Sequence, residues 1–304
     1  METPRFQEIY TFPGIEFIEN VHVLPNGVLL LSTMKSPHLL YTLDPNAPKP
    51  VAKPAASFKD TTATGLTGIV ALGGDRYAVG GGVHQPFCFE RGSVHVYIVC
   101  LETKSVVDRI LVPDTATLNG MAGLPAHPHV VLGADSIDGR IFSIDTRTRD
   151  VKVLLENDAL APMPEAGLKI GINGLRIRDG HLYFTNSTRG SLARYPIDEH
   201  GNKVGEIEIL VQRPPGSTMF DDFAFDREGS AYIAAHPSSV IKVVKKGGEK
   251  EEEFSTEEVS GSGCEPKHPT SAALALDGKA IYLVTGGAWN EEPPTGGQVI
   301  RINV

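Results

Sequence analysis

Acidic, amide and hydroxyl side chains recur along the chain at nearly constant intervals, and each opens an apolar segment. They are Glu19 with Asn20, Thr67, Asn119, Asn173, Asp221 with Asp222, and Thr270. Counted from Glu19, these openings lie 48, 52, 54, 48 and 49 residues apart. Carboxylate and amide oxygens that converge in a fold can hold a hard cation such as Ca²⁺ or can position a substrate. Glu19, Asn173 and Asp221 are the oxygen donors best suited to either role.

Each opening is followed by the same series of short elements. An apolar strand, a tight turn and a second strand are predicted, for example in NGLRIRDGHLYFTNS from Asn173 and DDFAFDREGSAYIAA from Asp221. A third strand follows in each repeat, as in GRIFSID, and a fourth in most, as in VKVLLE. No long segment has the 3.6-residue apolar period of a helix. Four strands at a repeat of about fifty residues are typical of propeller blades, so we predict one all-β domain over residues 1–304, a six-bladed β-propeller.

The last repeat ends at Val304 with three predicted strands. The early segment RFQEIYTF is predicted to supply the fourth strand, which closes the ring and pairs an edge that an open sheet would expose. A sandwich of similar hairpins is the alternative, but a sandwich does not require a sixfold repeat.

A propeller would bring the polar openings together. In this fold the first strand of each blade lines a central channel, and the strand starts surround one mouth of it. Two hypotheses remain open: the side chains satisfy backbone groups at crowded strand starts, or they bind a cation or a substrate. Two carboxylates close together, with no Arg or Lys in the same motifs, need a cation or have at least one raised pKa. His22, on an inner strand, is either an acid or base in the channel or a hydrogen-bonded core histidine.

Two long loops are predicted on the same face as the polar openings. GGVHQPFCFERGS brings His84, Phe87 and Phe89, and GGAWNEEPPTGG brings the only tryptophan, Trp289. Long loops on a rigid scaffold often carry binding function. These side chains either pack their own loops or form an apolar rim around a polar floor, which is the usual composition of a small-molecule pocket. The predicted substrate-binding residues are Asn20, His22, His84, Phe87, Phe89, Asn119, Asp222 and Trp289.

Composition limits the classes of function. The chain has 304 residues, a net charge of −9, and apolar runs much shorter than the ~20 residues that a bilayer requires. An acidic surface repels nucleic acid, so we expect neither nucleic acid nor a membrane as a partner. The N-terminus lacks an apolar signal segment, and three cysteines without metal-binding spacing suit a reducing compartment. We expect a cytoplasmic protein whose partner is a small apolar organic molecule, and the oligomeric state stays open.

The motifs around three of the polar residues resemble those of a known superfamily. ENVHV, INGLRIRDGHLYFTN and FDDFAFDREGSAYIA resemble segments of the gluconolactonase, SMP-30 and strictosidine synthase-like proteins. These are six-bladed propellers that often carry a divalent metal on a Glu, an Asn and an Asp, and the matching positions here are Glu19, Asn173 and Asp221. The chain departs from that pattern: it has ENV for the usual EGP, DDF for PDG, and Thr117 where the sugar lactonases have an arginine.

Nearly the whole chain resembles a narrower group, the fungal propellers of natural-product gene clusters that include hetero-Diels-Alderases. The resemblance rests on ENVHVLPNGVLLLSTMKSPHLLYTLDP, LNGM, GADSIDGRIFSID, GINGLRIRDGHLYFTNS and DDFAFDREGSAYIA. It implies a cofactor-free cyclase of fungal secondary metabolism that closes a ring in an apolar polyketide- or terpenoid-type substrate. Glu19 or Asp221 would move a proton, while Asn119 and Asn173 would polarise a carbonyl. A lactonase or esterase that binds Ca²⁺ or another divalent ion through Glu19, Asn173 and Asp221 is the first alternative, and a non-catalytic metabolite-binding propeller is the second.

Overall fold

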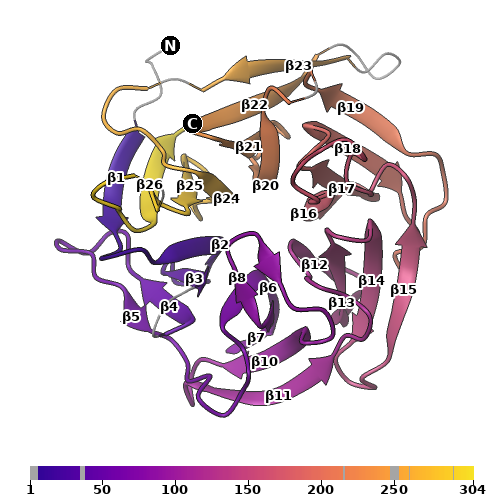
Figure 1. Cartoon of the computed structure of the whole chain (residues 1–304), viewed down its shortest axis with the longest axis horizontal. Helices are drawn as coiled ribbons and strands as arrows, with labels where there is room; N and C mark the ends of the chain where they lie inside the picture. Colours follow the sequence, from indigo (N-terminus) through magenta and orange to yellow (C-terminus); the bar gives the residue numbers. More distant parts are fainter. Residues whose placement is uncertain (1–5, 35–37, 215, 247–252, 260, 290) are drawn as a thin grey trace.

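The computed structural model describes residues 6–34, 38–214, 216–246, 253–259, 261–289 and 291–304. Antiparallel sheets stand around a common centre in Figure 1, which confirms the predicted β-propeller. None of the described residues lies in an α-helix, so none of them belongs to a helix that could cross a membrane.

Within the described residues, the strand pairing divides into four-stranded units. The first unit holds β2 (Phe17–Val23), β3 (Leu29–Met34), β4 (Leu40–Leu43) and β5 (Lys53–Pro54). The second unit holds β6 (Gly65–Gly73), β7 (Arg76–Gly82), β10 (His95–Cys100) and β11 (Ser105–Leu111). One residue pair, Met34 with Gly65, joins these two units into a single sheet. The third unit holds β12 (Met121–Leu124), β13 (His127–Asp135), β14 (Arg140–Asp145) and β15 (Val151–Glu156).

The remaining units follow the same order of strands. The fourth holds β16 (Ile172–Arg178), β17 (His181–Asn186), β18 (Ser191–Pro196) and β19 (Glu208–Gln212). The fifth holds β20 (Met219–Phe225), β21 (Ala231–His236), β22 (Ser239–Lys246) and β23 (Glu253–Glu258). The last sheet holds β24 (Pro269–Leu274), β25 (Ala280–Thr285), β26 (Gln298–Asn303) and β1 (Phe6–Thr11). In this sheet β1 pairs with β26, with Phe6 opposite Ile302, so the N-terminal strand covers the edge of the C-terminal one.

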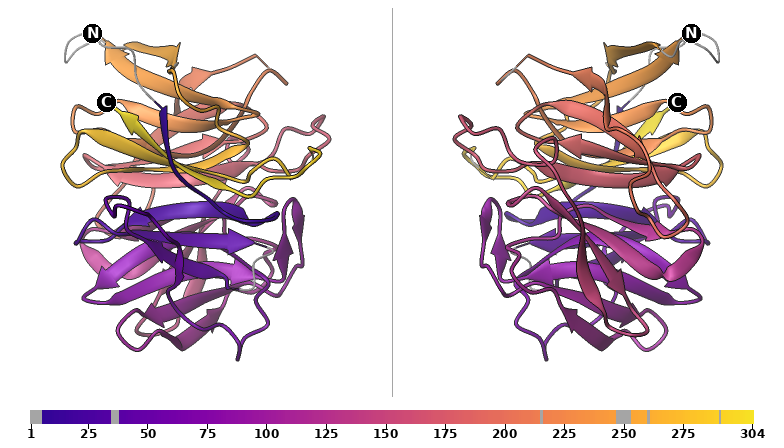
Figure 2. Two further views of the ribbon diagram at one scale, coloured as in Figure 1. Left: turned by 90° about the vertical axis from the view of Figure 1, so that its left-hand side faces the viewer. Right: turned by 90° about the vertical axis from the view of Figure 1, so that its right-hand side faces the viewer.

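A short hairpin interrupts the second unit between β7 and β10. It consists of β8 (His84–Gln85) and β9 (Cys88–Phe89). In the left-hand view of Figure 2 this hairpin rises from the same face of the propeller as the connection between β25 and β26 and the connection between β15 and β16. Three loops from distant parts of the chain therefore surround one end of the channel.

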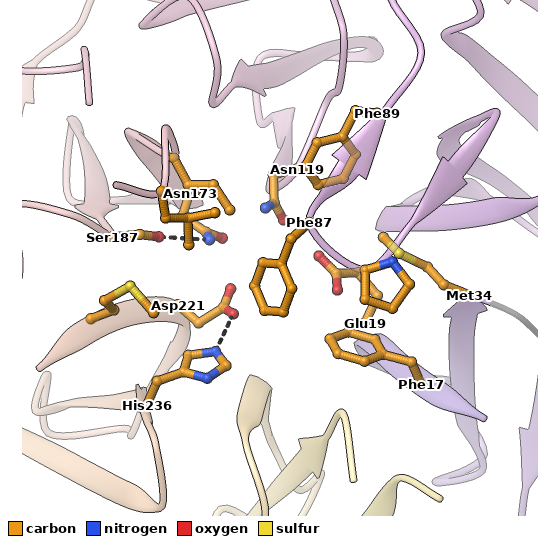
Figure 3. Close-up of a pocket in the computed structure, with 14 residues that line it drawn as sticks. Phe17, Glu19, Met34, Phe87, Phe89, Asn119, Asn173, Ser187, Asp221 and His236 are labelled. Carbon is orange, nitrogen blue, oxygen red and sulfur yellow. Dashed lines mark hydrogen bonds and ion pairs between the residues drawn. The ribbon is translucent and has the colours of Figure 1, made fainter. Parts of the chain in front are cut away.

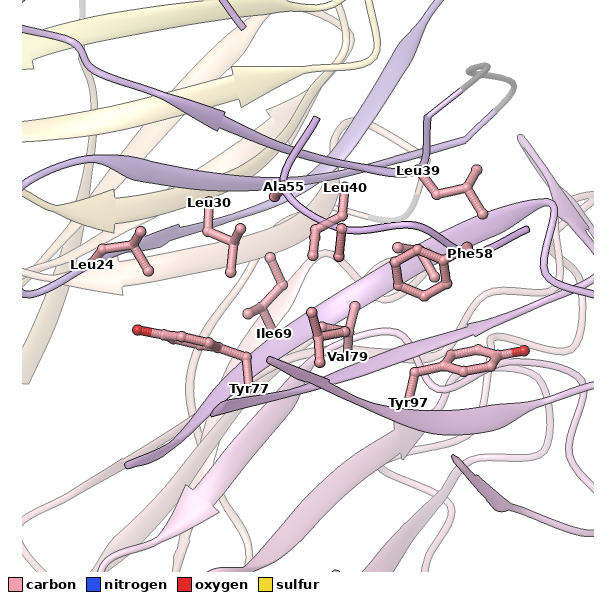
Figure 4. Close-up of a cluster of buried hydrophobic side chains, with 13 residues drawn as sticks. Leu24, Leu30, Leu39, Leu40, Ala55, Phe58, Ile69, Tyr77, Val79 and Tyr97 are labelled. Carbon is pink, nitrogen blue, oxygen red and sulfur yellow. The ribbon is translucent and has the colours of Figure 1, made fainter. Parts of the chain in front are cut away.

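The hydrophobic core lies between neighbouring sheets. Figure 4 shows one such layer, where Leu30 and Leu40 of the first unit pack against Ile69, Val79 and Tyr97 of the second. A strand that is covered on both faces reads as a continuous apolar run, and all six residues of β25 are buried in this way. Burial of each large apolar side chain contributes about 1.5–3 kcal/mol, so these layers fix the inner strands around the channel.

Hydroxyl groups tie the inner strands of neighbouring sheets to one another. Thr67 Oγ1 donates a hydrogen bond to the carbonyl of Leu118, and Thr270 Oγ1 donates to the carbonyl of Ile18 at 2.8 Å. Both threonines are fully buried. For these two residues of the recurring polar set, the hypothesis that they satisfy backbone groups is therefore supported.

Candidate active site

A pocket lies at the channel mouth where the inner strands begin (Figure 3). Its polar lining residues are Glu19, Asn119, Asn173, Ser187, Asp221 and His236. Its apolar lining residues are Phe17, Met34, Pro86, Phe87, Phe89, Leu168, Ile170 and Met219. They leave a cavity of about 30 Å³, which holds no more than one or two water molecules. A polar floor under an apolar wall is the composition of a small-molecule site.

Irregular strand pairing directs the polar side chains toward this mouth. The pairing of β2 with β3 skips Glu19, and the pairing of β16 with β17 skips Asn173 and Gly174. The pairing of β20 with β21 likewise skips Asp221 and Asp222. A β-bulge removes a residue from the ladder and re-aims its side chain, and bulges are common next to active sites. The bulges explain how inner strands packed for stability still present carboxylates and an amide to the channel mouth.

Glu19 is a buried acid, only 8% exposed. None of the hydrogen bonds found among the described residues involves its carboxylate. The pKa of Glu19 is raised well above its usual value, first because burial disfavours the charged form and then because Asp221 and Asp222 lie nearby. Its carboxyl group therefore retains a proton to higher pH than an exposed glutamate and can act as a proton or hydrogen-bond donor.

Asp221 is hydrogen-bonded to a histidine of the same sheet. His236 Nε2 donates a hydrogen bond to Asp221 Oδ2 at 3.0 Å. Burial raises the pKa of Asp221, the hydrogen bond and charge of His236 oppose that rise, Asp222 adds to it and Asn173 opposes it. The pocket thus contains one buried acid without a hydrogen-bond partner among the described residues and a second acid that is hydrogen-bonded to a histidine, which is an arrangement suited to acid–base chemistry.

Asn173 presents an unsatisfied oxygen to its surroundings. Its Nδ2 donates to Ser187 Oγ at 3.0 Å, while its buried Oδ1 has no hydrogen-bond partner among the described residues. An orphaned buried oxygen calls for a partner that the chain itself does not supply, such as a ligand hydroxyl group or a cation. Asn119 also lines the pocket and is 6% exposed.

Asn20 and Asp222 were predicted as substrate-binding residues, but they lie outside this pocket. Asp222 Oδ2 accepts hydrogen bonds from Asn20 Nδ2 at 3.0 Å, from Ser271 Oγ at 2.8 Å and from Arg176 Nη2 at 3.0 Å. This network joins β2, β16, β20 and β24 beneath the pocket. Neighbouring side chains of a strand project in different directions. Asn20 and Asp222 therefore point away from the pocket and hydrogen-bond inner strands to one another.

His22 also lies away from the pocket. It lines a wider hollow, together with Asn20 and Arg176, toward the ends of the inner strands. Its ring packs edge-on against Tyr77, with 5.5 Å between the ring centroids. Burial, and secondarily the charge of Arg176, lowers the pKa of His22 to about 4. None of the side-chain hydrogen bonds found among the described residues involves the ring of His22, which lines the channel hollow, so both of its predicted roles stay open.

The two aromatic loops meet over the pocket, although not every predicted residue lines it. Phe87 and Phe89 line the pocket, whereas His84 is fully buried behind them, with Nε2 3.1 Å from the carbonyl oxygen of Ala116. Burial lowers the pKa of His84 to about 4, against the opposing effect of that carbonyl. Trp289 is absent from the pocket lining but packs on Phe87, with ring centroids 5.9 Å apart.

Several lining residues escaped the sequence analysis. His236 and Ser187 lie at the ends of second strands, which return to the face where the first strands begin. A histidine at the end of the second strand, in the same repeat as Asp221, was the available signal for His236. Leu168 and Ile170 come from the connection between β15 and β16, and no local pattern marked that loop.

The oxygen atoms of the pocket can also be compared with the ligands that a divalent metal ion prefers. Glu19, Asn173 and Asp221 offer two carboxylates and one orphaned amide oxygen, which is oxygen chemistry that Ca²⁺ accepts. Among the described residues, no group of three His, Cys, Asp or Glu side chains is placed to hold a metal ion. A cation here would therefore depend on amide oxygens and water for part of its coordination.

Comparison with known proteins agrees with the resemblance in the motifs. No family model matches the chain. Two curated relatives, from Phoma sp and Sarocladium schorii, are each described as a "Putative hetero-Diels-Alderase". Both are 27% identical to the chain, over 242 and 246 residues, which cover 72% and 71% of it. The chain spans 68% of the length of the first relative and 60% of the second, which is less than two thirds of the latter.

Solved structures share the architecture over almost the whole chain. A luciferin-regenerating enzyme aligns with a TM-score of 0.68 at 15% identity, covering 99% of this chain and 95% of that one. A calcium-binding regucalcin from Agrobacterium tumefaciens aligns with a TM-score of 0.63 at 13% identity, covering 97% and 94%. At such identities the likeness establishes the propeller fold, and the chemistry has to be argued from the site.

Proposed function

We propose that the chain is a cyclase that closes a ring in an apolar, natural-product-type substrate by a hetero-Diels–Alder or related pericyclic reaction. The observation that carries the proposal is the opposed pair of acids in an apolar-walled pocket: Glu19, with its raised pKa, and Asp221 with His236. The descriptions of the two curated relatives support it.

The proposed reaction does not require a covalent bond between the protein and the substrate. In a hetero-Diels–Alder closure, a C=C–C=O unit and an alkene form one C–C and one C–O bond, and no atom or electron is gained or lost. Holding the two reacting ends together removes much of the entropic barrier. The protonated Glu19 carboxyl and the amide of Asn119 donate hydrogen bonds to the carbonyl oxygen, which polarises the reacting unit.

Proton transfer prepares or completes the conjugated reactant. Asp221 accepts a proton from the substrate while His236 holds its carboxylate in place at 3.0 Å. Glu19 returns a proton on the other side of the pocket. The apolar wall, which includes Phe17 and Met219, excludes water and so strengthens these electrostatic contacts.

The test uses a conjugated enone that carries a tethered alkene, with the adduct and its stereoisomers separated by chiral chromatography. The wild-type protein should accelerate closure and favour one stereoisomer. Glu19→Gln should lower the rate by about 10²-fold, the usual contribution of a positioned acid. The exposed Glu102→Gln is the matched control and should behave as wild type. Equal rates and equal product ratios with and without the protein would contradict the proposal.

A metal-dependent lactonase is the second candidate, and the orphaned Asn173 Oδ1 favours it. Glu19, Asn173 and Asp221 would hold the divalent ion, which when bound would polarise an ester carbonyl. Purified protein should then contain one tightly held divalent ion, and a chelator should lower its melting temperature, since a ligand stabilises the native state by mass action. Hydrolysis of dihydrocoumarin that is lost with chelator and restored by Ca²⁺ would favour this candidate over the cyclase.

A further inference from the structure

We infer that the ring of Phe87 occupies a subsite for a planar, conjugated six-membered ring of the substrate, and that the tip of the β8–β9 hairpin withdraws to admit that ring. The inference rests on the proposed function in that it assigns a substrate class to the same pocket. The inference concerns binding and not turnover, so the subsite and the proposed reaction can be tested independently of one another.

Phe87 fills the mouth of the pocket. In Figure 3 its ring points over the space between Glu19 and Asp221. With Phe87 in this position the remaining cavity of about 30 Å³ is far too small for an organic substrate. Any substrate that reaches the two acids must therefore displace this ring first.

The surroundings of Phe87 suit a flat ring. Phe17 meets it edge to face, with 6.5 Å between the ring centroids and 84° between the planes. Trp289 lies on another side, 5.9 Å away and tilted by 54°. These are the separations at which aromatic pairs attract one another. A planar ring in the place of Phe87 would keep both contacts, and an oxygen substituent on it would face the acids of the floor.

The base of the hairpin is anchored to the rest of the propeller. The backbone amide of His84 donates to Thr64 Oγ1, which in turn donates to the His84 carbonyl, both at 2.9 Å. Just after the other strand, Arg91 donates to both carboxylate oxygens of Asp138, at 2.7 and 2.9 Å. The hairpin as a whole is therefore not free to swing, and a movement that clears the pocket is confined to its tip.

Beyond the pairing of Gln85 with Cys88, ring packing is what holds Phe87 at the tip within the described part of the chain. Phe87 has a φ of 60°, in the left-handed region that bulky residues rarely adopt. No hydrogen bond of its backbone is found within the described part of the chain. Phe87 is 38% exposed, so part of this residue faces solvent. A conformation that costs free energy and depends on two ring contacts is readily exchanged for one in which a ligand makes those contacts.

The experiment measures binding of phenol, a planar ring with one oxygen, and of cyclohexanol, a puckered ring of the same size. Isothermal titration calorimetry is performed on wild type, Phe87→Ala, Phe87→Gly and Phe254→Ala. Glycine adopts a φ of 60° without strain, so Phe87→Gly guards against misfolding of the alanine variant. Phe254→Ala removes a phenyl ring from β23 that does not line the pocket and is the matched control.

Removing the Phe87 ring should tighten phenol binding by about tenfold or more, because the open state of a wild-type gate is populated to roughly 0.1–10%. The Phe87 variants should also prefer phenol to cyclohexanol, and Phe254→Ala should bind phenol as wild type does. Unchanged phenol affinity in both Phe87 variants, or equal affinity for the two alcohols, would overturn the subsite. If phenol binds as expected but the enone assay fails, the proposed reaction is wrong and the subsite stands.

Discussion

Replacing Glu19 by glutamine should make the protein more stable at neutral pH and less active. Glu19 is 8% exposed and lies near Asp221 and Asp222. Ionising it in the folded state therefore opposes both burial and two neighbouring acids. Glutamine has nearly the same shape and carries no charge, so the variant avoids this cost while it loses the acidic proton.

The sign and the slope follow from proton linkage. The folded-state pKa of Glu19 is raised above its unfolded value, which is near 4.5. At pH values between the two, the folded protein holds one more proton than the unfolded chain, so its free energy of unfolding falls as pH rises. One proton corresponds to roughly 1.4 kcal/mol per pH unit. The free energy of unfolding of Glu19→Gln does not depend on this proton. The variant should therefore be about as stable as wild type below about pH 4.5. Above that pH, its free energy of unfolding should exceed that of wild type by an amount that grows at the slope given above, until the raised pKa of Glu19 is passed.

Urea unfolding at several pH values, followed by circular dichroism, measures this difference directly. The exposed Glu102→Gln should leave the pH dependence of the free energy of unfolding unchanged. Turnover of the enone probe is measured on the same samples. Two outcomes would contradict the reasoning: Glu19→Gln could be less stable than wild type at neutral pH, or both proteins could lose stability in parallel as the pH rises. In either case Glu19 is not a buried protonated acid and cannot have the role given to it in the mechanism.

Three further predictions concern the frame that holds the site. Asp222→Ala should lower the free energy of unfolding by about 3–5 kcal/mol, because it removes the buried carboxylate that pairs with Arg176. The control Asp108→Ala removes an exposed ion pair with Arg149 and should cost about 0–1 kcal/mol in the same urea titration. Phe6→Ala should cost about 3–5 kcal/mol, since β1 packs this side chain into the core of the last sheet; a melting temperature equal to wild type would refute that role. Thr270→Val should lower the free energy of unfolding by about 1–3 kcal/mol, because the hydrogen bond to the Ile18 carbonyl is lost. An unchanged urea midpoint would show that this hydrogen bond between sheets does not stabilise the fold.

Local patterns were sufficient to predict the β-propeller fold and four of the polar side chains that line the pocket. A repeat near fifty residues, with turn residues between short apolar runs, indicated the propeller, because strand period and turn chemistry are encoded within a few residues of each other. The same repeat placed Glu19, Asn119, Asn173 and Asp221 at equivalent positions, and all four line one pocket. The N-terminal segment was likewise predicted from the missing strand of the last repeat, and β1 pairs with β26.

Only the tertiary structure decided which polar neighbours face the pocket and in which direction their pKa values shift. Asn20 and Asp222 carry the same chemistry as Glu19 and Asp221, yet bulges turn one set to the pocket and leave the other in a network with Arg176. A bulge arises from the pairing of two strands, so it has no signature in either strand alone. The partnership of Asp221 with His236 and the raised pKa of Glu19 depend on burial by side chains from several sheets, and burial is a property of the packed molecule that no single segment of the sequence determines.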